Sequence, residues 1–181
     1  MKKLWLILII STLSFSVRGQ FSKGTLQATG LTCAMCSNAV NKALQKVASV
    51  AVVRSDIKNS SFNITFKENV EIDIDALKRA VEDAGFSVGS LKLTGRFNQV
   101  TIAKDEHIKI GNSQFHFLNV EKQVLNGERI LTIVDKDFLT ARDFKKVSSS
   151  TTLECIQTGK ASTCCIKDGI PANTRIYHVT I

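Results

Sequence analysis

Two cysteines three positions apart, Cys33 and Cys36, are the residues of this sequence best suited to chemistry. Behind them, residues 37–47 carry apolar side chains at the i, i+3, i+4 and i+7 spacing of a helix with one buried face. The pair therefore lies in a loop that enters the first turn of a helix, where both sulfurs can converge on one ion. Free backbone N–H groups and the positive helix end favour thiolate over thiol there. Because thiolates are soft ligands, the pair predicts a site for Cu(I) or a similar soft ion.

Short strands and a second helix flank this loop in the sequence. Asp73 is a good N-cap for the second helix, and Gly85 lies where a glycine commonly ends one. The element order βαββαβ predicts an α+β fold, the ferredoxin-like sandwich, in which two helices cover one face of a sheet. The strands expected from apolar and polar alternation are residues 25–29, 50–57, 62–66 and 88–93.

The local sequence around the pair is distinctive, because it reads Gly30-Leu31-Thr32-Cys33-Ala34-Met35-Cys36. Val40 and Leu44 follow it, and the second helix closes with Asp83-Ala84-Gly85-Phe86. Over residues 24–94 these motifs resemble the heavy-metal-associated domain family, which includes copper chaperones. The resemblance implies binding of Cu(I), or in some members of zinc, cadmium or mercury, and transfer of the ion to a transient protein partner by ligand exchange.

The resemblance also implies roles for single residues. Cys33 and Cys36 would be the metal ligands, and Phe86 would take the aromatic place in the loop beside them. Thr32 stands where zinc- and cadmium-type members often have an acid, which favours Cu(I) over Zn(II). Met35 lies between the two cysteines and is expected to point away from the ion. Periplasmic mercury-binding proteins share this fold and site, and the motif does not separate Cu(I) from Hg(II).

Two other interpretations of the Cys33 and Cys36 pair stay open. An exported Cys-x-x-Cys can oxidise to a structural disulfide. A thioredoxin-like thiol-disulfide or metal reductase also places such a pair at a helix start, but it sets a cis-proline against the motif. The one proline here, Pro171, is far away in the sequence, and the strand order differs. We therefore expect metal binding rather than catalysis.

The N-terminus has the pattern of an export signal. Lys2 and Lys3 precede an apolar stretch, residues 4–13, and small residues near Gly19 offer a cleavage site. The apolar run is shorter than the roughly 20 residues of a spanning helix. We expect residues 1–20 to be a cleaved signal peptide and the mature protein to be periplasmic or secreted, with no stable membrane span.

The charge pattern argues against a nucleic-acid partner. The formal net charge is +8, but residues 24–94 hold eight Lys or Arg against seven Asp or Glu, and no run of basic residues occurs. A nucleic-acid footprint would need such a cluster. The near-balance in residues 24–94 instead predicts weak and transient docking to a protein partner.

The second half, residues 95–181, resembles no family that its motifs identify. Gly95 marks a change to short strand patterns, with turns expected at Gly111-Asn112 and Asn126-Gly127 and one short helix over residues 140–147. Many short strands with one helix predict a separate small β-rich domain, with an OB-like barrel as one form of it. The expected strands are residues 97–103, 107–110, 113–120, 129–134, 151–158 and 174–181.

Three further cysteines lie in this half: Cys155, Cys164 and Cys165. A disulfide from Cys155 to either neighbour is the default in an exported protein, and it would close a loop worth about 2–3 kcal/mol. The alternative is a second soft-metal site or a redox partner for Cys33 and Cys36. The three histidines fall on expected strands, where a surface position is the usual one. No Ser/His/Asp or paired-carboxylate arrangement stands out.

Overall fold

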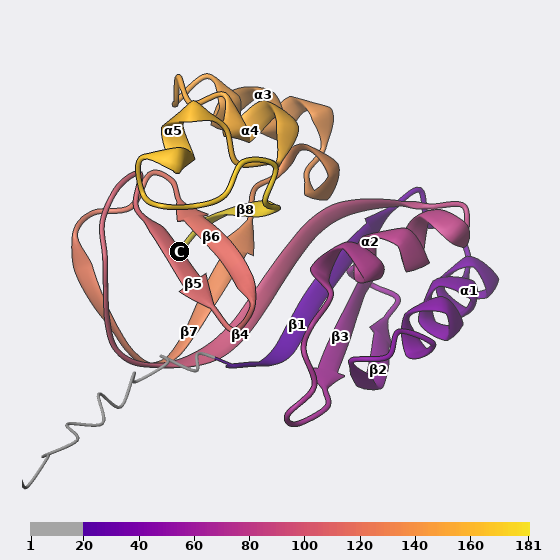
Figure 1. Ribbon diagram of the computed structural model, residues 1–181. Helices are drawn as coiled ribbons and strands as arrows, with labels where there is room; N and C mark the ends of the chain where they lie inside the picture. Colours follow the sequence, from indigo (N-terminus) through magenta and orange to yellow (C-terminus); the bar gives the residue numbers. More distant parts are fainter. Residues whose placement is uncertain (1–19) are drawn as a thin grey trace, which may run out of the picture.

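The computed structural model describes residues 20–181, so that the predicted signal peptide lies outside the described residues except for Gln20. Eight strands form one mixed sheet in the order β2-β3-β1-β4-β7-β8-β6-β5. Two helices lie at one end of this sheet, and the later helices gather over the other end (Figure 1). Within the described residues, no helix has the length and apolar character needed to cross a membrane.

The first half has the predicted βαββαβ order. Its two helices pack against each other, α1 also contacts β2, and α2 also contacts β4. The ferredoxin-like arrangement of this half is therefore confirmed. Its elements are β1 (Gln20–Thr29), α1 (Ala34–Gln45), β2 (Val50–Asp56), β3 (Ser61–Phe66), α2 (Ile74–Asp83) and β4 (Ser87–Ile102).

The ends of α2 follow the sequence signals. The side chain of Asp73 accepts a hydrogen bond from the backbone N–H of Ala76 at 2.9 Å, which satisfies one of the free donors of the first turn. Gly85 follows the last residues of the helix with a φ of +87°, a left-handed conformation that glycine adopts without the clash of a Cβ. Both ends of α2 were thus predictable from the sequence.

Strand β4 continues through the point where the sequence character changes. It runs for 16 residues, pairing with β1 on one side and with β7 on the other, and Gly95 pairs with both Phe21 and Arg129. The two stretches expected as separate strands, 88–93 and 97–103, are one strand. The division into folding units at residues 94 and 95 stays a prediction, but it is not a break in the sheet.

The second half is not a closed barrel, so the expectation of an OB-like barrel was wrong. Its strands extend the sheet of the first half through β4, and β5 is left as an open edge opposite β2. Strand β8 pairs parallel with β6 and antiparallel with β7, and three short helices lie on this part. Its elements are β5 (His107–Ile110), β6 (Ser113–Phe117), β7 (Gln123–Ile133), η1 (Lys136–Phe138), α3 (Ala141–Ser148), α4 (Cys155–Thr158), α5 (Thr163–Ile166) and β8 (Ile176–Thr180).

Two local expectations for this half were also wrong. Asn126-Gly127 is not a turn, because Gly127, with a φ of +72°, lies inside β7. The register shifts opposite it, between Phe97 and Val100, so the left-handed residue belongs to an irregularity of the ladder rather than to a hairpin. Residues 151–158 form a loop and the short helix α4 instead of a strand.

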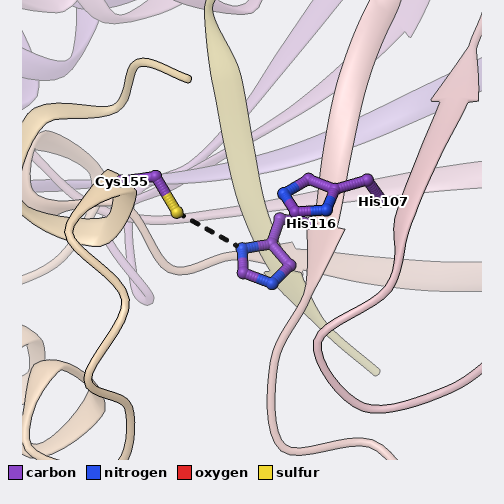
Figure 2. Close-up of side chains that lie close together, drawn as sticks. All are labelled: His107, His116 and Cys155. Carbon is purple, nitrogen blue, oxygen red and sulfur yellow. Dashed lines mark hydrogen bonds between the residues drawn. The ribbon is translucent and has the colours of Figure 1, made fainter. Parts of the chain in front are cut away.

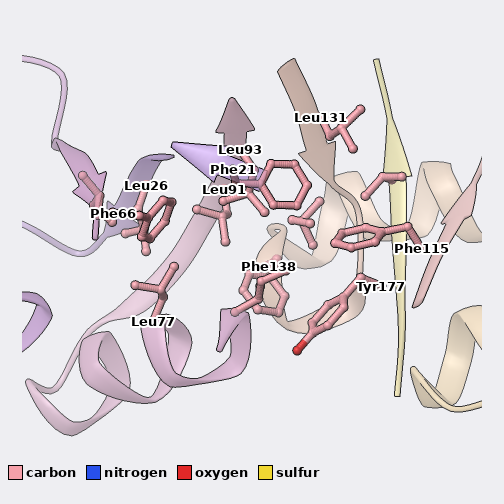
Figure 3. Close-up of a cluster of buried hydrophobic side chains, with 14 of the residues drawn as sticks. Phe21, Leu26, Phe66, Leu77, Leu91, Leu93, Phe115, Leu131, Phe138 and Tyr177 are labelled. Atoms are coloured by element: carbon pink, nitrogen blue, oxygen red, sulfur yellow. The ribbon is translucent and has the colours of Figure 1, made fainter. Parts of the chain in front are cut away.

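The main apolar core runs through both halves, and two smaller apolar clusters lie in the second half. Leu26, Leu91 and Leu93 are fully buried on the first-half side, and Phe115 is fully buried on the second-half side (Figure 3). Phe21 of β1 contacts Phe115 of β6, with ring centroids 5.5 Å apart. The halves therefore share packed side chains as well as a strand.

A polar cluster also joins the halves. The guanidinium of Arg175 donates to both carboxylate oxygens of Asp75 on α2, at 3.0 and 3.1 Å, and the Tyr177 hydroxyl donates to the same carboxylate at 3.1 Å. Arg175 also forms an ion pair with Asp135 at 2.9 Å. Burial alone would raise the pKa of Asp75, but the hydrogen bonds and charge of Arg175 outweigh it and lower that pKa.

Candidate metal centre

Cys33 and Cys36 lie at the N-terminus of α1, as the sequence predicts. Cys33 is the N-cap, with extended backbone, and its sulfur accepts a hydrogen bond from the backbone N–H of Cys36 at 3.3 Å. The two Sγ atoms are 2.7 Å apart, and both cysteines are free thiols. Cys33 is exposed and Cys36 partly exposed, so an ion or a partner's ligand can reach both sulfurs from solvent.

The electrostatics of this end of α1 favour the thiolate. The hydrogen bond from the Cys36 thiol lowers the pKa of Cys33, and the backbone N–H of Cys36 lowers it further. The helix N-terminus adds a partial positive charge at the same place. The site can thus offer a thiolate and a neighbouring thiol to a soft cation at the protein surface.

The flanking residues occupy the places that the resemblance implies, while their roles stay predictions. The Met35 side chain is 83% exposed. Thr32 is exposed as well. The half-buried Phe86 lies beside the loop, since its ring is 3.9 Å from where a Cβ on Gly30 would stand. Gly30 has a φ of +82°, and this left-handed residue turns the chain from β1 into the cysteine loop.

Comparisons with known proteins agree with this geometry. A model of the "Heavy-metal-associated domain" matches residues 25–87. The mercuric transport protein periplasmic component of Serratia marcescens is 33% identical over 86 residues, covering 48% of this chain and 93% of that protein. The chain belongs to the heavy-metal-associated domain family. Outside residues 25–87 it is not assigned by that family model.

Copper proteins are among the relatives of this heavy-metal-associated domain. The copper chaperone CopZ of Staphylococcus haemolyticus is 30% identical over 63 residues, covering 35% of this chain and 91% of that protein. A probable copper-exporting P-type ATPase of Archaeoglobus fulgidus is 36% identical over 64 residues, covering 35% of this chain. The chain spans only 8% of the ATPase. The relatives thus include proteins named for copper and for mercury.

A second group of metal-ligating side chains lies in the other half, around Cys155. The ligand atoms of His107, His116 and Cys155 are within 4.8 Å of one another (Figure 2). The three thiols of Cys155, Cys164 and Cys165 are within the same distance of one another. His178 adds a third imidazole, with its Nε2 3.3 Å from the Cys155 sulfur. Together these six side chains form the Cys155 cluster: Cys155, Cys164, Cys165, His107, His116 and His178.

The three histidines form a row across adjacent strands. His107 on β5 is the register partner of His116 on β6, and His116 is the register partner of His178 on β8. His116 and His178 are fully buried, so the expectation of a surface position for His116 was wrong. Sequence alternation could not show this, because helices cover the face of β6 that was expected to meet solvent. The parallel pairing that aligns His116 with His178 joins residues far apart in the chain.

Carboxylates hold two of these imidazoles. Asp135 bonds to Nδ1 of His178 at 2.6 Å, and Asp168 bonds to Nδ1 of His107 at 2.7 Å. In His178 this leaves Nε2 facing the Cys155 sulfur, and in His107 it leaves a buried Nε2. Burial, together with the neighbouring His107 and His178, lowers the pKa of His116 to about 3, so its imidazole is neutral at pH 7. Neutral imidazole is the form that binds metals.

The thiols of the cluster differ in exposure. Cys155 and Cys165 are buried and Cys164 is half-buried, and all three are free. Burial raises the pKa of Cys155, the opposite of the shift at Cys33. The Sγ atoms of Cys164 and Cys165 are 3.5 Å apart, and the Ser162 hydroxyl lies 3.2 Å from the Cys164 sulfur. The structure thus brings together the three cysteines that the sequence singled out.

Cys155, His178 and Asp135 also follow the order of a nucleophile, a base and an orienting acid. The sulfur lies 3.3 Å from Nε2 of His178, whose Nδ1 bonds to Asp135. However, the Cys155 side chain is fully buried, and a nucleophile must reach its substrate. The arrangement therefore fits a buried ligand held by neighbouring groups better than a catalytic centre.

Proposed function

We propose that this protein binds Cu(I) through Cys33 and Cys36 and passes the ion to a protein partner. The proposal rests chiefly on one observation: two free thiols converge at an exposed helix N-terminus in a heavy-metal-associated domain. Soft thiolates favour Cu(I), and their exposure leaves room for a third ligand from outside. Binding, rather than catalysis, is the function that this surface serves.

Transfer follows from the same exposure. A thiolate or thioether of the partner approaches the open side of the bound ion and adds as a third ligand. One of Cys33 and Cys36 then leaves, and the second follows after another partner ligand has bound. The near-balance of charge in residues 24–94 keeps the docking weak, so that the partners separate once the ion has moved.

Export is part of the proposal. Residues 1–20 would direct the chain to the periplasm or the exterior and be removed there. In an oxidising compartment Cys33 and Cys36 would form a disulfide unless metal or a reductant protects them. Metal loading would then both protect the pair and prepare it for transfer.

Mercury is the second candidate. It is supported by the similarity to a periplasmic component of mercuric transport, which extends over 93% of that relative. Hg(II) also prefers two thiolates, and the local motif suits either ion. Competition between Cu(I) and Hg(II) for the reduced protein, each buffered by a chelator of known affinity, separates the two candidates.

A transfer experiment tests the main proposal. The full-length reduced chain is loaded with excess Cu(I), freed of unbound copper and mixed with an apo heavy-metal-associated domain as acceptor, and copper is measured in both after separation. The double change Cys33→Ser and Cys36→Ser should stop transfer, because it removes the exposed pair of thiols. Asn38→Ala, an exposed change on the same helix, is the matched control and should transfer normally. Unchanged transfer by the double variant would contradict the proposal.

A further inference from the structure

The Cys155 cluster has no role in the transfer described above, yet it gathers the donor types of a transition-metal site. Three thiols come from α4 and α5, and three imidazoles come from β5, β6 and β8. His116 and His178 are buried polar side chains, and such groups are found inside proteins when they are hydrogen-bonded or bind a metal. A purely structural role would leave none of these buried polar atoms without a hydrogen-bond partner.

Two of the imidazole nitrogens lack such partners. Nε2 of His107 and Nε2 of His116 are buried without a hydrogen-bond partner among the described residues. The His107 side chain is only 4% exposed, and its Nδ1 is taken by Asp168. A buried polar atom left without a partner costs about 1–3 kcal/mol. The imidazole row is therefore not a completed hydrogen-bond network.

Two of the distances within the cluster are close to those between ligands on one ion. Metal–sulfur bonds of about 2.3 Å and metal–nitrogen bonds of about 2.0 Å at tetrahedral angles place sulfur and nitrogen roughly 3.5 Å apart. The Cys155 sulfur lies 3.7 Å from Nδ1 of His116, the imidazole nitrogen that faces it. The 3.5 Å between the sulfurs of Cys164 and Cys165 is close to the value of about 3.8 Å for two thiolates on one ion.

We propose that the Cys155 cluster is a second, buried site for one Cu(I) ion. The ion binds the thiols of Cys155, Cys164 and Cys165, with the His116 imidazole as a weaker fourth contact. Binding involves no electron transfer: Cu(I) replaces the proton of each thiol that it binds as thiolate, and that proton is released to solvent. This inference goes beyond the proposed function, because it does not depend on transfer by Cys33 and Cys36.

The neighbours of the cluster fit this role. His178 contacts the Cys155 sulfur and is itself hydrogen-bonded to Asp135. These two residues form an outer shell that fixes the direction of the Cys155 ligand. Cys164 is the half-buried member, so it gives the ion a route from solvent to the inner thiols. The ion pair of Asp135 with Arg175, which also binds Asp75 of α2, connects this outer shell to the first half.

The test measures how many Cu(I) ions bind to a chain that lacks the surface site. The full-length Cys33→Ser and Cys36→Ser variant, kept reduced, is titrated with Cu(I) against a chromophoric Cu(I) chelator. One tightly bound equivalent should remain, and X-ray absorption should show sulfur as the main ligand. Adding Cys164→Ser should abolish the binding, whereas adding Thr163→Ser, an exposed neighbour on α5, should not.

Two further variants keep the test decisive. Cys155→Ala should also abolish the binding, and circular dichroism checks that this chain folds. His116→Asn should weaken it by about 10–100-fold without abolishing it. No copper bound to the variant lacking Cys33 and Cys36 would overturn the second site and leave the transfer proposal intact. Binding of Zn(II) but not Cu(I), or a disulfide at Cys155 in the protein from its native compartment, would overturn the copper assignment.

Discussion

The Cys33 and Cys36 pair and the Cys155 cluster use the same ligand atom in opposite surroundings. At the surface, a helix end and a neighbouring thiol lower the pKa of Cys33. In the interior, burial raises the pKa of Cys155. The sulfur chemistry is shared, so the surroundings decide how each site can behave.

The different surroundings of the two sites should also affect how fast each one exchanges a bound ion. A partner's ligand can approach an ion on Cys33 and Cys36 directly, because Cys33 is exposed. An ion beside Cys155 is enclosed by β6, β8 and the short helices, so it leaves only through Cys164 or by local opening. We infer that the surface pair suits exchange and the interior cluster suits retention.

The largest expected effect is in thiol reactivity. Labelling with a maleimide, followed residue by residue by mass spectrometry under anaerobic conditions, should modify Cys33 at least about 10³-fold faster than Cys155, because the buried thiol reacts only after opening that costs several kcal/mol. Cys164 should fall between them. The same reaction in concentrated urea provides the control, since all five rates should converge there. Labelling of native Cys155 at the rate of Cys33 would remove the contrast between the two sites.

The next effect is in the polar connection between the halves. Asp75→Asn keeps the shape of the side chain but removes the charge bound by Arg175 and Tyr177, and it should lower the free energy of unfolding by about 1–3 kcal/mol at pH 7. Asp83→Asn, an exposed change at the end of α2, should alter it by less than about 0.5 kcal/mol.

The pH dependence of this effect has a definite sign. The pKa of Asp75 is lower in the folded protein than in the unfolded chain, so its contribution is complete above the unfolded value of about 3.9. It is lost as the pH falls through the folded pKa, because protonation removes the charge. Chemical unfolding at a series of pH values should show the wild type and Asp75→Asn converging below about pH 4. A gap that persists at low pH would assign the loss to packing instead.

The sequence predicts the Cys33 and Cys36 pair better than the Cys155 cluster, and the reason is physical. Cys33, Asp73 and Gly85 act on their own helix ends, so local signals fixed α1 and α2 and placed the surface thiols correctly. The Cys155 cluster depends on a parallel pairing of β6 with β8, between residues 114–117 and 176–179. Its helices α4 and α5 have four residues each, too few to show a helical period.

The same limit applies to the boundary between the halves. The change in composition at Gly95 is real, but strand pairing depends on partners elsewhere in the chain, and β4 finds β1 and β7 on its two sides. A barrel was therefore expected where the strands instead continue an existing sheet. Predicting the row of histidines would have required the pairing registers of β5, β6 and β8, which local sequence patterns do not provide.

The smallest expected effect tests whether the two regions unfold together. Asp73 caps α2 in the first half, and Thr140 caps α3 in the second by accepting a hydrogen bond from the backbone N–H of Asp143 at 3.2 Å. Asp73→Ala and Thr140→Ala should each lower the free energy of unfolding by about 1 kcal/mol, and Asp73→Asn, which can still cap, should lower it less.

The informative result is which amides show each loss of stability. Hydrogen exchange at denaturant concentrations near the midpoint reports on amides of β3 and of β8 separately. If β4 and the shared core make one cooperative unit, either cap change shifts both sets of amides by the same free energy. If residues 24–94 and 95–181 unfold independently, Asp73→Ala shifts only the β3 amides and Thr140→Ala only those of β8. Retention of an ion at the Cys155 cluster would then be independent of the stability of the domain that carries Cys33 and Cys36.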